Sequence, residues 1–352
     1  MKTIKHLLVA GFACIMLLSL SIVASANYDD RSTNFQDFME SFEIAPLEDQ
    51  IAMRENFNVE EPINVVKPII VATELPSDPR NVEVYDFNTN VITTYPYSDY
   101  EDKTITGTVG SPLKDSSDAT NLYANGDTRI QITNVNSYKK VVYILSYYYD
   151  KDGKPVIHQG SGAAISKTGI LTAGHAIYDH SFGWPYKVEV IPGGPNSNAA
   201  TYTMYPGRGG VMTCPTGWTQ EKRTDYDYAV LNFNNEFPTG VGHFGTRAYF
   251  NDSDLLYKDV YHYGFPGDKV RGTLWRLSGR IENLYETRQF IYTGYSNSGE
   301  SGAPIVRQSD TEYIVGVYSG GRYYDDEYYN VAVRITDDLI SFLVKYGGAE
   351  RA

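Results

Sequence analysis

Short runs of β-branched and aromatic residues, separated by turns that contain glycine or proline, recur along the chain from about residue 121 onward. Such runs are typical of β-strands, and many short strands with frequent turns indicate sheets that close on themselves or pack together. Val141–Tyr149 is one such run, and Asp152-Gly153 turns it into Val156-Ile157. We expect further strands at Gly162–Ile165, Val188–Ile191, Tyr228–Phe233, Val260–Tyr263, Ile291-Tyr292, Ile305-Val306, Ile314–Val317 and Val331–Ile335.

The pattern takes a helical period near the end of the chain. Thr336 is suited to the N-cap, and Asp337 and Asp338 occupy the first turn, where the helix dipole favours negative charge. Gly347 is expected to end the helix. Its apolar face consists of Leu339, Ile340, Phe342 and Leu343. The sequence therefore predicts an all-β body followed by a C-terminal helix.

The first 26 residues have the features of a signal peptide. Lys2 and Lys5 precede an apolar run, residues 7–23, which ends in Ala24-Ser25-Ala26. Small residues at these positions favour cleavage before Asn27, and the run is short for a membrane anchor. We therefore expect a secreted, extracellular protein with no stable membrane association. Removal of this segment would leave Cys214 as the single cysteine, which we expect to be buried rather than nucleophilic.

The charge of the chain is unevenly distributed. Residues 27–120 carry 19 acidic and 6 basic residues, so this stretch accounts for most of the net charge of −13. The remainder is nearly neutral and has no basic patch, which argues against nucleic acid as a partner. The histidines show no paired ligand spacing, so we expect no metal and no cofactor.

A serine flanked by glycines carries the clearest chemical signal. In Ser298-Gly299-Glu300-Ser301-Gly302, the glycines allow a tight turn that exposes the hydroxyl of Ser301. The N–H groups of Gly299 and Ser301 can then point the same way and form an oxyanion hole. This motif alone is weak, because many loops contain a Gly-x-Ser-Gly sequence.

His175 and Asp227 complete a candidate catalytic set. His175 follows the expected strand that ends at Leu171, and Asp227 opens the apolar strand Tyr228–Phe233. A serine nucleophile needs a base, and the base needs an acid that holds it in one tautomer. The order His, Asp, Ser is the chymotrypsin order and differs from those of subtilisin and the α/β-hydrolases.

The chain resembles the chymotrypsin-fold bacterial glutamyl endopeptidases and the related exfoliative toxins over residues 121–345. The segments that carry the resemblance are Asp127–Thr133, Leu171–His175, Asp227–Leu231, Gly264–Lys269, Gly299–Pro304 and Val317–Gly321. The resemblance implies a serine endopeptidase with two six-stranded antiparallel β-barrels, a catalytic site between them, and a removed pro-segment. It identifies His175, Asp227 and Ser301 as the catalytic residues.

The specificity pocket is where the match to this family fails. Members that cleave after glutamate carry a histidine at the position of Tyr318, and a Thr or Ser hydroxyl at that of Ser296. Neither Tyr318 nor Ser296 supplies positive charge at neutral pH, so both an acidic and an uncharged substrate residue remain open. Tyr295 is expected at the pocket floor. Ser319 and Gly320 lie on the strand that the resemblance assigns to substrate alignment.

Glu300 stands where animal trypsin-like enzymes have an aspartate that pairs with the freed N-terminus. One hypothesis is that Glu300 receives the α-amino group released by processing. The alternative is a solvated loop carboxylate.

These patterns divide the chain into three parts. Residues 1–26 are the signal peptide, residues 27–120 an acidic pro-segment with an amphipathic helix around residues 34–44, and residues 121–352 the protease domain. A small acidic accessory domain is the alternative for residues 27–120. We expect cleavage between residues 107 and 126 by an activating protease.

The expected substrate is a protein or peptide, and the expected form is a monomer. The alternative function is a protease-like toxin or binding protein with restricted or no general proteolytic activity. A lipase or esterase is disfavoured, because the chain lacks Gly-x-Ser-x-Gly and has a different residue order.

Overall fold

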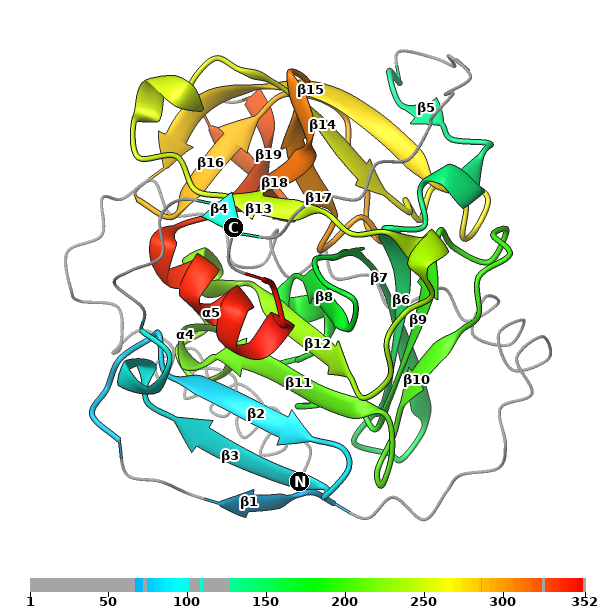
Figure 1. The fold of residues 1–352 in the computed structure, drawn as a ribbon, viewed down its shortest axis with the longest axis vertical. Coiled ribbons are helices and arrows are strands. Elements are labelled where there is room, and N and C mark those ends of the chain that lie inside the picture. The colour runs from blue at the N-terminus through cyan, green and yellow to red at the C-terminus, as the bar shows by residue number, and fades with distance from the viewer. Residues whose placement is uncertain are drawn as a thin grey trace, which may run out of the picture.

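The computed structural model describes residues 67–71, 75–101, 108–109, 127–285, 287–324 and 327–350. The expected signal peptide, the helix expected at residues 34–44 and most of the expected cleavage region lie outside these residues. Two β-units fill the picture in Figure 1, one above the other, and a single longer helix lies across the front. In the described part of the chain, no helix is long and apolar enough to cross a membrane.

The first β-unit is a sheet whose strands pair antiparallel except at one outer edge. Its ladder runs β11-β12-β8-β7-β6-β9-β10, and three further strands extend it beyond β11. The strands are β6 (Val141–Tyr149), β7 (Pro155–Ala164), β8 (Gly169–Thr172), β9 (Lys187–Pro192), β10 (Tyr202–Met204), β11 (Gly210–Pro215) and β12 (Ala229–Phe233). The strands expected at Val156-Ile157 and Gly162–Ile165 are both part of β7, because no turn interrupts its pairing with β6.

The second β-unit is a closed six-stranded barrel. Its ladder runs β17-β14-β15-β16-β19-β18, and the pairing of β17 with β18 closes it. These strands are β14 (Asp259–Gly264), β15 (Trp275–Tyr285), β16 (Gln289–Tyr292), β17 (Pro304–Arg307), β18 (Asp310–Tyr324) and β19 (Glu327–Arg334). The short strands β4 (Thr108–Val109), β5 (Ile130–Gln131) and β13 (Gly245–Arg247) pair at its margin.

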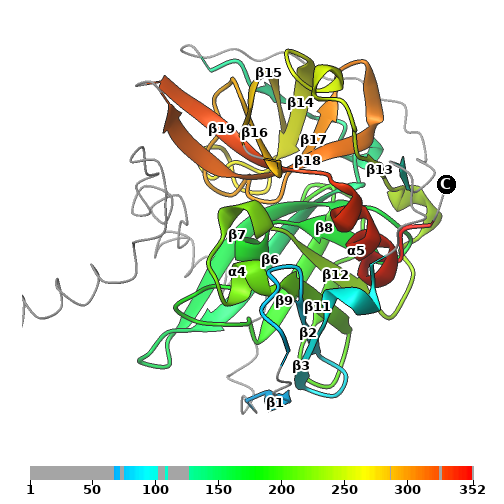
Figure 2. The same cartoon turned by 90° about the vertical axis from the view of Figure 1, so that its left-hand side faces the viewer.

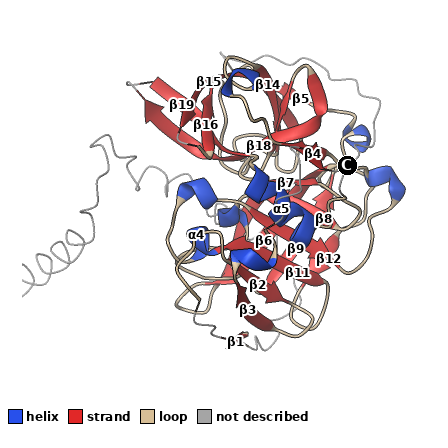
Figure 3. Cartoon of the chain, turned by 60° about the vertical axis from the view of Figure 1, so that its left-hand side comes forward, coloured by secondary structure: helices blue, strands red, loops and turns tan. Residues whose placement is uncertain are grey.

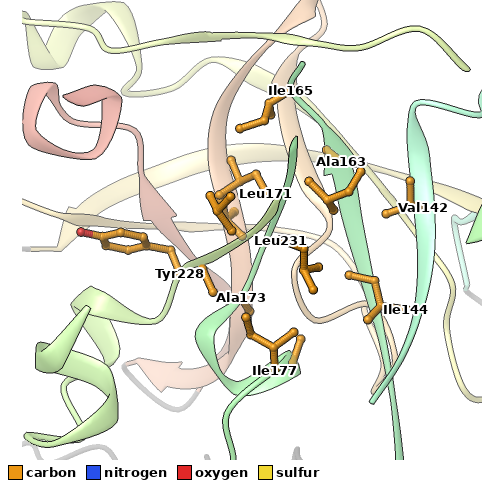
Figure 4. Packing of buried hydrophobic residues seen from close by; sticks show 14 of the residues in the cluster. Val142, Ile144, Ala163, Ile165, Leu171, Ala173, Ile177, Tyr228 and Leu231 are labelled. Carbon is orange, nitrogen blue, oxygen red and sulfur yellow. The ribbon is translucent and has the colours of Figure 1, made fainter. Parts of the chain in front are cut away.

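Apolar side chains of alternating strand positions fill the first β-unit. Figure 4 shows Val142 and Ile144 of β6 facing the same interior as Leu171 and Leu231, which come from β8 and β12. All four side chains are at most 1% exposed. Burial on this scale is the main force that holds the strands in this arrangement.

The C-terminal helix α5 (Asp337–Gly347) begins and ends where the sequence predicts. Thr336 is the N-cap residue, although its hydroxyl bonds Asp338 rather than a backbone N–H. Gly348 adopts the left-handed conformation that ends the helix. The predicted apolar face is fully buried against β8 and β12. A mostly β body with one C-terminal helix is thus confirmed, as the red strands and few blue helices of Figure 3 show.

The other helices in the described part of the chain are short. They are the four-residue α4 (Thr216–Thr219) and the single-turn helices η1 (Tyr97–Asp99), η2 (Val135–Ser137), η3 (Gly174–Ala176), η4 (Thr224–Tyr226), η5 (Thr239–Val241) and η6 (Asp252–Asp254). Two of these turns, η3 and η4, lead into the candidate site.

Four strands of the described residues come from the part of the chain that composition assigns to the pro-segment, and one of them is β4. The other three are β1 (Ile69–Val71), β2 (Val82–Asp86) and β3 (Val91–Tyr95). The β2–β3 hairpin pairs with β11, and β1 pairs in parallel with β3 at the outer edge. In Figure 1 these blue strands lie below β11 and continue its sheet. The prediction for this segment included no strand, because it rested on the composition of the whole segment.

Candidate active site

His175 and Asp227 meet through two hydrogen bonds. His175 lies in η3, directly after β8, and Asp227 lies between η4 and β12. The ring Nδ1 of His175 is 2.7 Å from Oδ2 of Asp227, and the backbone N–H of His175 donates to Oδ1 at 2.8 Å. Asp227 is fully buried, and His175 is 5% exposed. One carboxylate therefore fixes both the ring and the backbone of this histidine.

Ser319 adds a third donor to the same carboxylate. Its hydroxyl, on β18 of the second barrel, donates to Oδ2 of Asp227 at 2.5 Å. Asp227 thus joins the first sheet to the second barrel at the site. The sequence predicts a substrate contact for Ser319, but its side chain is committed to Asp227, so its backbone alone is left for that role.

The turn that carries Ser301 packs against the segment before His175. The carbonyl oxygen of Ser301 accepts the Ser161 N–H at 2.7 Å. Gly302 adopts a φ of +86°, and a Cβ at this position would overlap the Thr172 hydroxyl and lie 2.8 Å from the Ala173 nitrogen. Thr172 and Ala173 directly precede η3. Glycine at 302 is therefore what allows the turn of Ser301 to approach the histidine segment.

The two N–H groups expected to form an oxyanion hole lie on the same turn. Gly299 has a φ of +81°, and a Cβ there would overlap the Gln159 amide and lie 2.7 Å from the carbonyl oxygen of Phe265. Within the described residues, neither the N–H of Gly299 nor that of Ser301 has a protein acceptor. This arrangement leaves both donors for a ligand, as an oxyanion hole requires.

The side chain of Gln159 and the loop Gly264–Lys269 hold the turn of Ser301 in place. Only the loop is marked by a sequence motif. The Gln159 amide donates to the carbonyl oxygen of Phe265 at 2.8 Å and accepts from the Tyr143 hydroxyl at 2.9 Å. The N–H of Gly267 donates to the carbonyl oxygen of Ser298 at 2.7 Å. The loop Gly264–Lys269, singled out by its resemblance to a family motif, thus supports the serine turn. Gln159 lies within a strand and carries no local sequence signal.

Ser296 and Tyr318 lie together in a hydrogen-bonded chain with Asn330. The Tyr318 hydroxyl is 2.7 Å from the Ser296 Oγ, and Ser296 also bonds Oδ1 of Asn330. The Asn330 amide nitrogen donates to the carbonyl oxygen of Gly294 at 3.0 Å. Because the single hydroxyl proton of Ser296 goes to Asn330, Tyr318 must be the donor to Ser296. The hydroxyl groups of Tyr318 and Ser296 thus both donate hydrogen bonds within this neutral group of three side chains.

Tyr295 does not lie at a closed pocket floor. Its side chain is half exposed, and its ring covers the guanidinium of Arg129 at 4.8 Å from the ring centroid. Arg129 itself is fully buried and bonds Asp268 through Nη1 at 2.9 Å and Asp127 through Nε at 2.9 Å. Carboxylates therefore surround the cation nearest to Tyr295.

Glu300 is fully buried, so the solvated-loop alternative is wrong. Its Oε2 accepts the Asn297 N–H at 2.7 Å and lies 3.6 Å from Nη1 of Arg129. Burial raises the pKa of Glu300 to about 8, although Arg129 and the Asn297 N–H oppose the shift. The His262 ring lies 3.7 Å from Oε1, but burial lowers the pKa of His262 to about 3, so this contact is not an ion pair.

The buried Glu300 predicts a specific pH dependence of stability. The folded-state pKa of about 8 lies above the ordinary value of 4.5, so the folded state holds a proton that the unfolded state releases. The stability that this group contributes is therefore complete below pH 4.5 and is lost as the pH rises through 8. We expect the free energy of unfolding of the wild type to fall by about 1.4 kcal/mol per pH unit between pH 5 and 8 because of this group. Glu300→Gln should abolish this fall.

Urea unfolding at several pH values, in the background of Ser301→Ala to prevent self-digestion, measures this difference. Glu236→Gln is the matched control, because Glu236 is exposed and its replacement should leave the pH dependence unchanged. Parallel stability curves for wild type and Glu300→Gln would show that Glu300 is ionised throughout.

A family model described as Trypsin matches residues 135–341, which is more than half of the chain. The chain belongs to the trypsin family of serine endopeptidases. The predicted resemblance to chymotrypsin-fold glutamyl endopeptidases is confirmed by relatives within this family and by a structural match.

Two curated relatives and one solved structure illustrate the similarity. The "Extracellular metalloprotease" of Bacillus subtilis (strain 168) is 29% identical over 216 residues, which cover 61% of this chain and 65% of the relative. The "Glutamyl endopeptidase" of Bacillus licheniformis is 30% identical over 244 residues, covering 62% of this chain and 67% of the relative. A solved "Glu endopeptidase in complex with MPD" has the same fold, with a TM-score of 0.52 and 23% identity over 64% of this chain and 100% of that one.

The match to these relatives spans about two thirds of their length. The word metalloprotease is part of one relative's name and says nothing of this chain. Among the residues that the structure describes, no group of three or more His, Cys, Asp or Glu could hold a metal ion.

Cys214 is buried, as the sequence predicts. Its thiol is free and 0% exposed. Burial raises the pKa of this thiol well above its ordinary value, which disfavours the thiolate that a nucleophile needs.

Proposed function

We propose that the protein is a secreted serine endopeptidase that hydrolyses peptide bonds through an acyl-enzyme on Ser301. The observation that carries this proposal is the buried carboxylate of Asp227, which contacts both the ring Nδ1 and the backbone N–H of His175. Such a carboxylate holds Nδ1 in its protonated form, so that Nε2 carries the lone pair and acts as the base.

In the proposed reaction each of these groups has one role. The Ser301 hydroxyl attacks the scissile carbonyl carbon while Nε2 of His175 takes its proton, and the oxyanion binds the N–H groups of Gly299 and Ser301. His175 returns the proton to the leaving amine as the C–N bond breaks, which leaves an ester on Ser301. Water, deprotonated by His175, attacks this ester and releases the acid product and the free serine.

Secretion and processing complete the proposal. The residue pattern of the first 26 positions supports export, and the acidic composition of residues 27–120 supports a segment that is separated from the protease domain. We place the cleavage between residues 107 and 126. An activating protease makes this cut, and the processed enzyme acts on extracellular proteins as a single copy that does not oligomerise.

Labelling with an organophosphorus reagent tests the proposed function. We expect the processed protein to hydrolyse casein, and the reagent to abolish this activity by adding one phosphoryl group to Ser301, as mapped by mass spectrometry. A chelator should leave the activity unchanged. Casein hydrolysis that the chelator abolishes and the reagent spares would contradict the proposal, and so would a processed protein without hydrolysis.

The neutral pocket predicts little discrimination between glutamate and glutamine at the cleavage site. Tyr318, Ser296 and Asn330 carry no charge at neutral pH, and their hydrogen bonds satisfy one another. A substrate carboxylate would lose its hydration without gaining a charged partner from these three residues. We expect kcat/KM for matched peptides with Glu or Gln at this position to differ by less than about tenfold. A Glu preference of about a hundredfold or more would contradict this account of the pocket.

A further inference from the structure

The β2–β3 hairpin completes the outer edge of the first sheet. Its strand β2 pairs antiparallel with β11, from Val82 opposite Pro215 to Asp86 opposite Val211. The turn after β2 continues the pairing, since the N–H of Phe87 donates to the Gly210 carbonyl at 3.1 Å. Figure 2 shows β2 and β3 against β11 and beneath α5. Without this hairpin, β11 would be an unpaired edge strand.

The hairpin and the residues that follow it also contribute to the main hydrophobic core. Residues 78–100 place six apolar side chains in the cluster that contains the interior of the first sheet. Each of them is at most 9% exposed. They are Val82, Tyr85, Phe87, Ile92, Tyr97 and Tyr100.

Two aromatic contacts connect this segment to distant elements. The Tyr85 ring meets the Trp184 ring edge-on at 6.0 Å, and the Tyr100 ring meets the Phe342 and Tyr346 rings of α5 at 6.1 and 5.4 Å. The segment therefore contacts both the loop before β9 and the C-terminal helix. Such buried aromatic contacts are those that dominate the energy of stable interfaces.

The start of the segment satisfies the first backbone donors of α4. The N–H groups of Thr216 and Gly217 donate to the carbonyl oxygens of Asn81 at 2.6 Å and Pro79 at 2.8 Å. Helix α4 carries Trp218, whose ring lies 6.1 Å from that of His175. The segment thus supports the helix that packs beside the candidate base.

We propose that residues 78–100 stay bound to the protease domain after the chain is cut between residues 107 and 126. The processed enzyme is then a non-covalent complex of two fragments. This inference rests on the proposed processing between residues 107 and 126. Main-chain pairing to β11 supplies the register, and the buried aromatic side chains supply the affinity. The occupant of the β11 edge is therefore this chain's own segment 78–100.

A defined cut tests the inference. The chain from residue 27 onward, with Ser301→Ala, receives a recognition sequence for a site-specific protease after residue 118 and is then cleaved. We expect native mass spectrometry and gel filtration at about micromolar concentration to show both fragments in one complex. Cys214 is the single cysteine from residue 27 onward, and it should react slowly with a thiol reagent, because it lies on the paired strand β11 and is fully buried.

Two variants on the hairpin separate specific docking from non-specific retention. Phe87→Ala removes a fully buried ring and should weaken the binding of the fragment about a hundredfold or more. Tyr95→Ala removes an aromatic ring of the same hairpin that is 40% exposed, and the fragment should remain bound. Release of the fragment from the Phe87→Ala complex should also speed the reaction of Cys214.

Separation of the wild-type fragment in native buffer would overturn the inference, and so would equal retention in the Phe87→Ala and Tyr95→Ala complexes. The proposed function is tested independently, by casein hydrolysis with Ser301 intact. A stable two-fragment complex that does not hydrolyse casein would refute the function and leave the inference standing. An active processed enzyme that has lost residues 78–100 would support the function and overturn the inference.

Discussion

Replacement of Ser301 by alanine should lower kcat for peptide hydrolysis by about 10⁶ and leave thermal stability almost unchanged. The hydroxyl is the proposed nucleophile, so its loss removes the covalent route, and the remaining rate comes from substrate binding and the oxyanion donors. The variant lacks only one oxygen atom in a turn held by backbone hydrogen bonds. Burst kinetics with an activated ester and a thermal melt of the purified protein measure the two effects.

Ser278→Ala is the matched control for this variant. Ser278 lies on β15 in the second barrel, and its side chain is exposed. We expect wild-type activity from it. Hydrolysis by Ser301→Ala within about tenfold of wild type would exclude Ser301 as the nucleophile.

Replacement of Asp227 by asparagine should lower kcat by about 10⁴ at neutral pH. An amide at this position can no longer accept the Nδ1 proton in the same arrangement, so the imidazole takes the wrong tautomer and Nε2 ceases to be a base. The backbone bond from His175 to the same side chain would keep the geometry close to that of wild type. Peptide kinetics, with a crystal structure or melt to confirm folding, check this result.

Ser319→Ala separates the charge of Asp227 from its hydrogen bonding. This variant removes one donor to Oδ2 but keeps the carboxylate and its contact with His175. A single hydrogen bond to a charged group accounts for a loss of about tenfold to a hundredfold, well short of 10⁴. If Asp227→Asn and Ser319→Ala had equal activity, the tautomer argument would be wrong.

Composition and packing place the boundary of the protease domain at different points of the chain. Composition separates residues 27–120 from the rest, because charge and proline content differ along the chain. Packing includes the segment 78–100 in the protease domain, because this segment belongs to the same core as β6 and α5. A segment of unfavourable overall composition can still dock when its few apolar residues alternate along a strand and meet a free sheet edge.

The sequence by itself determined those strands, helix ends and turns whose formation depends on residues that are neighbours in the chain. The strand Val141–Tyr149 has the bounds predicted from its apolar run, and α5 begins after Thr336 as its capping pattern predicts. The glycines around Ser301 marked a turn with the unusual backbone angles that the structure has at Gly299 and Gly302. Local periodicity, capping and turn chemistry carry this information within a few residues.

Only the tertiary structure decided how distant residues are used. The Ser319 hydroxyl contacts Asp227, 92 positions away, and Glu300 is buried beside Arg129 rather than exposed in a loop. Asn330 and the β2–β3 hairpin likewise acquire their partners only when strands from remote parts of the chain pair. Burial and hydrogen-bond partners across such separations depend on the folded arrangement, and no local pattern encodes them.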